Sequence, residues 1–348
     1  MKEGTGRLVA TFRAYLEKVP FLKIDSWKKE ARLGEFTPDV VVKLSLPAGV
    51  QVIIVEIKSS GQPRFAREAV NQLFRYRDEA PGMYGVFMAP YISSQAASIC
   101  EKAGIGYADL AGNCRLVFGQ IYIERCEWPN PSIAKRELRS LFTSKAARIL
   151  SVLSSDPRRS WKVLDLAREA RVSLGQASNV KKLLEDREWV ERSVKGLRLS
   201  HPDEVLAAWA SSYSFGKNRI RNYSSAEAPA EIEAKLKDIC GELGITCALT
   251  GFSAAAKLAP AVDLQQVMAY VDGRIEELAR RLDLRDLPGG ASVSLVEPAD
   301  RGVFIGSSEI DGQRIVSPVQ LYLDLKSMKG RGEKAAEEIL EKVIKPKW

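Results

Sequence analysis

The chain has 348 residues, 45% of them hydrophobic, which is enough for two or three packed domains. Its single histidine, His201, argues against multi-histidine metal enzymes and histidine-relay nucleases, and its five cysteines lack the paired spacing of zinc sites. No apolar run reaches transmembrane length and the N-terminus is too polar for a signal peptide, so we expect a cytoplasmic protein with no membrane association. In that compartment we expect the five cysteines to be reduced thiols.

The net charge of +8 is distributed unevenly along the chain. Residues 1–130 carry 17 basic and 14 acidic side chains, residues 131–222 carry 19 and 10, and residues 223–348 carry 16 and 20. The basic middle predicts binding to a polyanion, which the acidic C-terminal part does not. Two prolines in Trp128-Pro129-Asn130-Pro131 disfavour a continuing helix or strand and mark the first domain boundary. We therefore expect three domains, residues 1–130, 131–222 and 223–348.

Two runs rich in β-branched residues, 40–46 and 50–57, predict a β-hairpin around Pro47-Ala48-Gly49. A two-residue loop at Ala48-Gly49 would bring Asp39 opposite Lys58. Because side chains alternate along a strand, Glu56 and Lys58 share one face, and Asp39 joins them there. A register slip of one residue would separate the three side chains.

Charged side chains at strand ends are costly to bury unless they have a partner such as a metal ion. The carboxylates of Asp39 and Glu56 offer the oxygen ligands that Mg²⁺ (or Mn²⁺) prefers, and a lysine beside them can orient an attacking water or neutralise developing charge. The pattern therefore predicts phosphodiester chemistry at Asp39, Glu56 and Lys58. The alternative is a cross-strand ion pair between Asp39 and Lys58, with Glu56 solvated.

Residues 30–125 resemble the PD-(D/E)xK nuclease superfamily in Pro38-Asp39, in Glu56-Ile57-Lys58 and in a following helix that carries Gln72 and Tyr76. The last two match the Q-x-x-x-Y signature of the RecB-like branch, and at i, i+4 they share one helix face. The resemblance implies a restriction-endonuclease-like mixed sheet. It also implies a metal at Asp39, Glu56 and Ile57, water activation by Lys58, and support of the site by Gln72 and Tyr76.

Two features of this region stay open. The superfamily often adds a glutamate on its first helix, and Glu17 and Glu35 are both candidates. Gln72 and Tyr76 also have a simpler interpretation, in which the helix packs its apolar residues on the sheet and turns these polar ones outward.

Further along, the pattern predicts a strand over 85–88, a helix over 93–103, and one or two strands over 116–123. Asp109 and Asn113 lie between them in a polar segment. They could reach a substrate backbone, but we interpret them as turn-forming residues.

The basic middle has helical periodicity over 145–153, 161–170 and 174–187, followed by a short hairpin of residues 189–192 and 197–199. This order is that of a winged helix-turn-helix, and the resemblance covers about residues 144–200.

On the third of these helices, five residues form the predicted inward stripe: Leu174, Ala177, Val180, Leu183 and Leu184. The outward residues would meet base edges and phosphates, and they are Gln176, Ser178, Asn179, Lys181 and Lys182. Lys195 and Arg198 on the wing would contact the backbone of double-stranded DNA. The alternative is a solvated basic helix in a domain used for protein contacts.

The C-terminal part has an α/β pattern. Helices are expected over 232–243, 253–258, 274–282 and 333–344, strands over 267–271, 292–296 and 302–305, and a hairpin turn at Asp311-Gly312. Gly251-Phe252-Ser253 followed by Asp272 resembles a nucleotidyltransferase, but no second acid stands two residues from Asp272, so we do not expect catalysis there.

Two stretches of this part resemble the regulators grouped with AbiEi, the antitoxins of type IV abortive-infection systems. They are Leu249–Ala255 and Leu321–Lys326, the latter followed by Gly330-Arg331-Gly332. The resemblance implies a transcriptional repressor and, as a protein partner of the C-terminal domain, a nucleotidyltransferase-like toxin.

We therefore predict a multidomain α/β protein with a nuclease-like domain, a winged helix-turn-helix and a C-terminal α/β domain. The leading hypothesis is a magnesium-dependent DNA endonuclease that the winged helix delivers to duplex DNA. One alternative is a non-catalytic regulator of the AbiEi kind that keeps the nuclease fold as a scaffold, and another is an interaction module that uses the acidic C-terminal part. The sequence leaves the oligomeric state open, a homodimer included.

Overall fold

The computed structural model describes residues 3–32, 35–125, 140–259, 266–286 and 291–348. The chain forms two compact units, Met1–Leu138 with Glu185–Glu188, and Arg139–Leu184 with Trp189–Trp348. Each unit contains a mixed sheet covered by helices, so the predicted α/β class is confirmed. The expected boundary at residues 128–131 lies outside the described residues, and the division into three domains stays a prediction.

Among the described residues, the sheet of the first unit has seven strands that follow one another in chain order. The strands are β1 (Lys23–Lys29), β2 (Val40–Leu46), β3 (Gly49–Ile57), β4 (Tyr84–Ala89), β5 (Gly106–Asp109), β6 (Cys114–Phe118) and β7 (Ile121–Arg125). Neighbours pair antiparallel except β3 with β4 and β4 with β5, which are parallel. The parallel centre needs a crossover, and α2 supplies it between β3 and β4.

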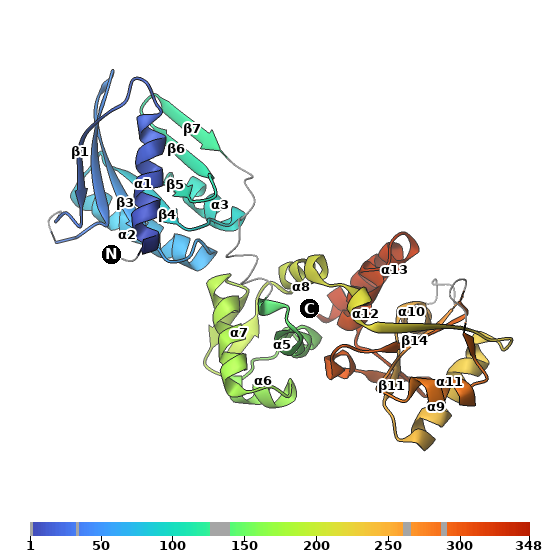
Figure 1. The fold of residues 1–348 in the computed structure, drawn as a ribbon. Coiled ribbons are helices and arrows are strands. Elements are labelled where there is room, and N and C mark those ends of the chain that lie inside the picture. The colour runs from blue at the N-terminus through green and yellow to red at the C-terminus, as the bar shows by residue number, and fades with distance from the viewer. Residues whose placement is uncertain (1–2, 33–34, 126–139, 260–265, 287–290) are drawn as a thin grey trace. The chain divides into compact units, whose positions relative to one another are not determined.

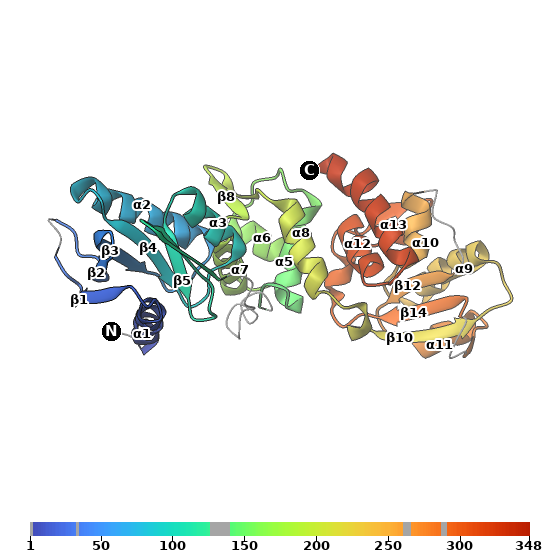
Figure 2. The same ribbon diagram turned by 90° about the horizontal axis from the view of Figure 1, so that it is seen from above.

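Helices cover both faces of this sheet (Figures 1 and 2). On one face α1 (Glu3–Glu17) packs Leu8, Phe12 and Leu16 against the side chains that alternate inward from β2 and β3. On the other face α2 (Pro63–Glu79) and α3 (Ser94–Lys102) form a second apolar cluster with Ile54 of β3. The face of β3 that carries Glu56 is therefore the face that α2 covers.

The register of the β2–β3 hairpin differs from the expected one. Leu46 pairs with Gly49 and Val40 with Val55, so the loop is Pro47-Ala48 rather than Ala48-Gly49. Gly49 has φ 135°, which lets the turn close one residue earlier than predicted. The expected pairing of Asp39 with Lys58 is wrong, because this register places Asp39 beside Glu56. The slip amounts to two residues and so keeps every side chain on its predicted face.

The second unit begins with the element order that the sequence predicts. It has α5 (Ser144–Ser155), α6 (Val163–Glu169), α7 (Leu174–Asp186), β8 (Val190–Ser193) and β9 (Gly196–Leu199). We call residues 144–199 the helix–hairpin segment.

Three of the five residues predicted to face inward on α7 are buried, and Leu183 is half-buried. Ala177, Val180 and Leu184 are buried as expected, and the hydroxyl of Ser173 accepts a hydrogen bond from the backbone N–H of Gln176, which makes it an N-terminal cap of α7. The prediction that Leu174 faces inward is wrong. Its side chain is 51% exposed, because Leu174 is the first residue of the helix.

The C-terminal sheet has the strand order β13-β10-β14-β12-β11-β16-β15. Its strands are β10 (Arg219–Ser224), β11 (Cys247–Leu249), β12 (Val267–Val271), β13 (Arg285–Asp286), β14 (Val293–Glu297), β15 (Ser308–Ile310) and β16 (Gln313–Ile315). The helices are α8 (Pro202–Ser212), α9 (Pro229–Leu243), α10 (Gly251–Leu258), α11 (Ile275–Arg281), α12 (Pro318–Lys326) and α13 (Arg331–Ile339). The strand β10 crosses the expected boundary at residues 222–223, so this sheet starts earlier than predicted.

Residues 302–305 do not form the expected strand. The segment Arg301–Phe304 is instead a 3-10 helix, η2, because the carboxylate of Asp300 accepts a hydrogen bond from the backbone N–H of Gly302 and starts a tight turn. The hairpin turn predicted at Asp311-Gly312 is confirmed by the pairing of Ile310 with Gln313. Across the described ranges, no helix has the length and apolar character needed to span a membrane.

The hairpin of β8 and β9 depends on Gly196. Its φ is 139°, and a Cβ atom there would lie 2.2 Å from the carbonyl oxygen of Trp161. Trp161 and Leu197 exchange backbone hydrogen bonds of 2.7 and 2.9 Å at this close approach.

We expect Gly196→Ala to lower the free energy of unfolding by about 1–3 kcal/mol, because it adds both backbone strain and a clash. Gly175→Ala is the matched control: Gly175 lies in α7 with no atom within 4 Å of the added Cβ, and the change should be neutral or stabilise by up to about 1 kcal/mol. Urea denaturation measures both. Equal stability of the two variants would contradict this account of the hairpin.

Candidate active site

Three elements bring the predicted catalytic residues of the first unit together. Asp39 directly precedes β2, Glu56 and Lys58 stand at the end of β3, and Gln72 and Tyr76 lie one helical turn apart on α2. Because α2 covers the face of β3 to which Glu56 belongs, its two polar side chains reach the end of the strand.

Glu56 is the buried centre of the cluster, with 3% of its surface exposed. The hydroxyl of Tyr76 donates a hydrogen bond of 2.8 Å to Oε1, and the ammonium of Lys58 lies 3.4 Å from Oε2. Burial raises the pKa of Glu56 above its ordinary value, and the charge of Asp39 raises it further, whereas Tyr76 and Lys58 oppose the shift.

Gln72 closes the cluster into a ring of hydrogen bonds. Its Oε1 accepts a bond of 2.8 Å from Lys58, and its Nε2 donates one of 2.5 Å to the hydroxyl of Tyr76. The ring thus runs from Glu56 through Tyr76, Gln72 and Lys58 back to Glu56. Both ends of the Gln72 amide are used, which fixes the orientation of its side chain.

Tyr76 is buried, so the interpretation in which Gln72 and Tyr76 face outward is wrong. The ring of Phe36 packs against that of Tyr76 with centroids 5.1 Å apart, a contact that the sequence did not predict. Burial raises the pKa of Tyr76 to about 12, so its hydroxyl remains a hydrogen-bond donor at neutral pH.

Asp39 is held to the end of β3 by its carboxylate. Its Oδ2 accepts a hydrogen bond of 2.7 Å from the backbone N–H of Ile57. Of the two candidate first-helix glutamates, Glu17 forms an exposed ion pair of 2.8 Å with Arg13, and Glu35 is exposed. None of the contacts among the described residues joins either glutamate to the cluster, so the choice between them stays open.

The donor set of this cluster fits a hard divalent cation. The carboxylates of Asp39 and Glu56 outnumber the ammonium of Lys58, which leaves one net negative charge. The part of the chain that the structure describes contains no group of three or more histidine, cysteine or acidic side chains arranged for a metal, so a third protein ligand would be an amide, hydroxyl or backbone oxygen. Mg²⁺ suits such a site because it keeps several water ligands.

The backbone oxygen that the nuclease resemblance implies as a ligand is the carbonyl of Ile57. Continuing the β2–β3 register by two residues from Val40 and Val55 places Pro38 across from Ile57. Proline has no N–H group, so it cannot donate a ladder hydrogen bond to that carbonyl.

The predicted DNA-contacting residues of the helix–hairpin segment lie on α7 and the hairpin. Ser178, Asn179, Lys182, Lys195 and Arg198 are exposed, and Gln176 and Lys181 are half-buried. Arg198 pairs with Glu191, its Nε lying 2.7 Å from Oε1. Val194 at the hairpin tip is fully exposed, which the sequence did not single out.

A second polar cluster lies in the core of the C-terminal part, around the buried carboxylate of Asp324. It accepts hydrogen bonds from the hydroxyls of Thr250 (2.5 Å), Tyr213 (2.5 Å) and Tyr270 (3.0 Å), and from the amide of Gln320 (2.8 Å). Burial raises the pKa of Asp324 to about 6, and the four donors oppose that shift. Thr250 and Asp324 belong to the two stretches that resemble AbiEi regulators, so the fold joins these stretches through a buried hydrogen bond.

Other polar residues singled out from the sequence have structural contacts. The carboxylate of Asp109 accepts hydrogen bonds from the backbone N–H groups of Gly112 and Asn113, which is the turn that we expected. The hydroxyl of Ser253 accepts one of 2.9 Å from the N–H of Met268. Asp272 forms an ion pair of 2.5 Å with Arg301.

The chain matches a known family over its C-terminal part. Residues 198–345 match the family described as transcriptional regulator, AbiEi antitoxin, type IV toxin–antitoxin system. The AbiEi resemblance is confirmed over this range. The match includes the Asp324 cluster and the end of the hairpin, but not the cluster around Glu56. A search among curated proteins gave no match.

Among solved structures, the chain is similar to a repair endonuclease from Pyrococcus abyssi, with 20% identity over 32% of this chain and 46% of that one and a TM-score of 0.25. It is also similar to EndoMS in a complex with double-stranded DNA, with 19% identity over 29% of this chain and 43% of that one and a TM-score of 0.23. The chain spans less than half the length of the structures that it matches.

The raised pKa of Glu56 predicts how its substitution changes stability. Since the folded state binds the Glu56 proton more tightly than the unfolded state does, stability falls as pH rises from the ordinary value of 4.5 through the raised pKa. Glu56→Gln removes this loss while keeping an acceptor for Tyr76. We expect it to raise the free energy of unfolding by about 0.5–2 kcal/mol at pH 8, and the gain to shrink below pH 4.5.

Chemical denaturation at pH 8 and pH 4 checks this. Glu17→Gln is the control, because this exposed glutamate contributes only a surface ion pair worth roughly 0.3–0.5 kcal/mol. A Glu56→Gln variant less stable than the wild type at pH 8 would show that the charge of Glu56 stabilises the fold.

Proposed function

We propose that this chain is a DNA-binding protein that hydrolyses phosphodiester bonds of DNA with Mg²⁺ at Asp39, Glu56 and Lys58. The observation that carries the proposal is the hydrogen-bond ring around Glu56. It holds a lysine ammonium 3.4 Å from a buried carboxylate at a strand end, where the side chain of Lys58 keeps 22% of its surface exposed. A purely structural ion pair gains little from such a position, because desolvation of the charges offsets their attraction.

Each residue has a distinct role in this proposal. Asp39, Glu56 and the carbonyl of Ile57 would hold Mg²⁺, which when bound supplies Lewis-acid polarisation of the scissile phosphate. Lys58 directs its ammonium toward the attacking water and stabilises negative charge that develops on the phosphate oxygens. Gln72 keeps the ammonium in place, and Tyr76 keeps the Glu56 carboxylate turned into the site.

The helix–hairpin segment supplies the affinity for DNA. As a winged helix-turn-helix it would place α7 in the major groove, with Gln176, Ser178 and Asn179 toward base edges. Lys182 on α7 and Lys195 on the hairpin would contact phosphates. The excess of 19 basic over 10 acidic side chains in residues 131–222 supports this role.

We expect Lys58→Ala to abolish Mg²⁺-dependent cleavage, because the ammonium acts in the transition state rather than in binding. Its affinity for duplex DNA should change less than about twofold, since other residues dominate binding. Lys43→Ala, an exposed lysine of β2, is the matched control and should cleave like the wild type.

The assay is cleavage of supercoiled, linear and single-stranded DNA with Mg²⁺, Mn²⁺ or EDTA, with gel shifts in parallel. Metal binding by calorimetry should survive in Lys58→Ala and be lost in Asp39→Ala. A wild type that leaves every substrate intact with both metals would contradict the nuclease proposal.

A second candidate function is transcriptional regulation of the AbiEi kind. The match over residues 198–345 favours it, and in this case the first unit would serve as a scaffold. A nucleotidyltransferase-like toxin would then be the partner of the C-terminal part. Such a regulator binds its own promoter and cleaves nothing, so the cleavage assay separates the two candidates.

Both candidates require salt-dependent binding of duplex DNA through the helix–hairpin segment. We expect the combined Lys182→Ala and Lys195→Ala substitution to reduce the slope of log affinity against log salt by about 2, because each phosphate contact contributes roughly 0.9. The combined Lys326→Ala and Lys329→Ala substitution, at exposed lysines at the end of α12 and in the turn after it, should leave the slope unchanged. Gel shifts between low and physiological salt measure it, and identical slopes for the two double variants would exclude the segment as the DNA reader.

A further inference from the structure

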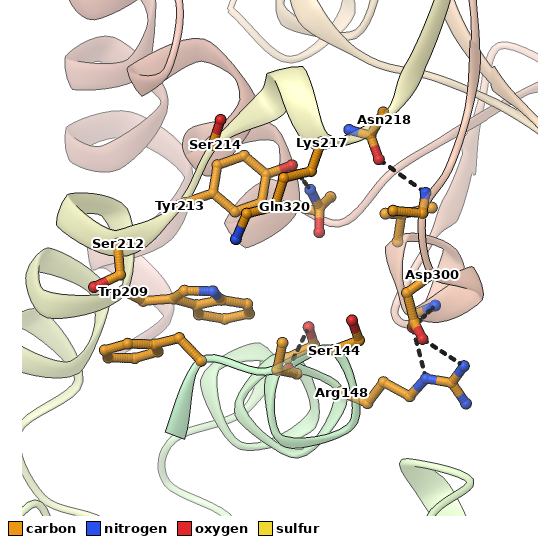
Figure 3. Close-up of a pocket in the computed structure, with 16 residues that line it drawn as sticks. Ser144, Arg148, Trp209, Ser212, Tyr213, Ser214, Lys217, Asn218, Asp300 and Gln320 are labelled. Carbon is orange, nitrogen blue, oxygen red and sulfur yellow. Dashed lines mark hydrogen bonds and ion pairs between the residues drawn. The ribbon is translucent and has the colours of Figure 1, made fainter. Parts of the chain in front are cut away.

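A cavity of about 110 Å³ lies within the second unit, between the helix–hairpin segment and the C-terminal part (Figure 3). The N-terminal half of α5 forms one wall with Ser144, Ala147 and Arg148. The opposite walls come from the end of α8, the 3-10 helix η1 (Phe215–Lys217) and α12. Since α5 packs directly against α12, the cavity adjoins the contact that joins the two parts of this unit.

The cavity has an aromatic wall with an unused donor. Trp209 is 3% exposed and lines the space together with Phe142. No hydrogen bond of the Trp209 indole N–H is found among the described residues, and its nitrogen is not one of the fully enclosed atoms without a partner, so it is open to a group that enters the cavity. Figure 3 shows the indole ring of Trp209 extending toward the middle of the cavity.

Gln320 supplies an unused acceptor. It is 6% exposed, and its Nε2 donates to the hydroxyl of Tyr213 at 3.0 Å and to the carboxylate of Asp324 at 2.8 Å. These two bonds fix the amide, because a flipped side chain would turn its oxygen toward the Asp324 carboxylate. The carbonyl oxygen of Gln320 then remains at the cavity wall without a donor among the residues described.

The charges around the cavity leave one positive charge uncompensated. Arg148 is neutralised by Asp300 through bonds of 2.7 and 3.0 Å, in the bidentate geometry of a strong pair. Lys217 lines the same space, and the described part of the chain gives its ammonium no ion pair or hydrogen bond. The carboxylate of Asp324 lies behind Tyr213 and Gln320 and is already bonded by four donors.

We propose that this cavity binds a small planar carboxylate that carries a hydroxyl or N–H group at its other end. The carboxylate would accept hydrogen bonds from Lys217 and from the indole N–H of Trp209, and the ring would pack against the aromatic wall. The hydroxyl or N–H group would donate to the carbonyl oxygen of Gln320. The space of about 110 Å³ is smaller than the engineered cavity of about 150 Å³ that accommodates benzene, so only part of such a ligand would be enclosed and its charged end would lie on the open side.

Such a ligand would contact α5 and the C-terminal part at once. Since α5 is the first helix of the helix–hairpin segment, occupancy would stiffen the attachment of that segment to the C-terminal sheet. The site is separate from the cluster around Glu56, so its test does not depend on cleavage.

Calorimetric titration of the full chain with 4-hydroxybenzoate tests the proposal, with 4-hydroxybenzamide as the uncharged analogue of the same shape. We expect 4-hydroxybenzoate to saturate one site with a Kd of about 1 mM or below, and 4-hydroxybenzamide to bind roughly tenfold more weakly or not at all. The melting temperature should rise with 4-hydroxybenzoate concentration for the same reason.

Variants assign the contacts. Lys217→Ala changes an exposed residue that the fold does not need and should weaken binding of 4-hydroxybenzoate roughly tenfold, whereas Lys329→Ala should not change it. Trp209→Phe keeps the aromatic wall but removes the N–H group, and it should weaken binding roughly fivefold. A cavity that holds only water would give no saturable heat up to about 10 mM, which would overturn the proposal. Equal affinities of the wild type and Lys217→Ala would overturn it as well.

Discussion

Desolvation of buried carboxylates is the constraint around which both units are arranged, because such a charge must be hydrogen-bonded or paired. The fold meets it in different ways. Backbone N–H groups of a turn and the Asn113 amide bind Asp109, and four neutral side-chain donors bind Asp324. Glu56 has one neutral donor and a lysine at 3.4 Å, and a second carboxylate nearby adds repulsion. Glu56 is therefore the least satisfied of the three, and a cation would bring it the largest gain.

The register of the β2–β3 hairpin explains why Asp39, Glu56 and Lys58 lie together although the expected pairing of Asp39 with Lys58 was wrong. The turn closes one residue earlier than expected, at Pro47-Ala48, which moves the partner of each β2 residue by two positions. An even slip preserves the alternation of the strand, so Glu56 and Lys58 keep the face that α2 covers. The true register also gives Asp39 a bond to the N–H of Ile57, which the expected pairing would not have provided.

Patterns with a strong local cause were predictable from the sequence, and contacts between distant segments were not. The helices of the helix–hairpin segment and the strand β12 follow from periodicity and β-branched runs, and they appear where expected. Phe36 against Tyr76, and Tyr213 beside Asp324, join residues 40 and 111 positions apart, for which no local signal exists. The strand expected over 302–305 failed because a single capping carboxylate, that of Asp300, overrides the weak strand preference of four residues.

The two candidate functions rest on separate parts of the chain, so support for one does not remove the other. The AbiEi match begins at residue 198 and therefore leaves the Glu56 cluster without an explanation. If the first unit were only a scaffold, uncharged side chains of similar size at positions 56 and 58 would be at least as stable as a buried carboxylate with a lysine. Gln72 also binds both Lys58 and the hydroxyl of the buried Tyr76, so it ties the ammonium of Lys58 to the part of α2 that packs in the core. A buried carboxylate that shares a strand end with a second carboxylate and a lysine is an arrangement that active sites often contain, and for this reason the proposal for the first unit is catalysis.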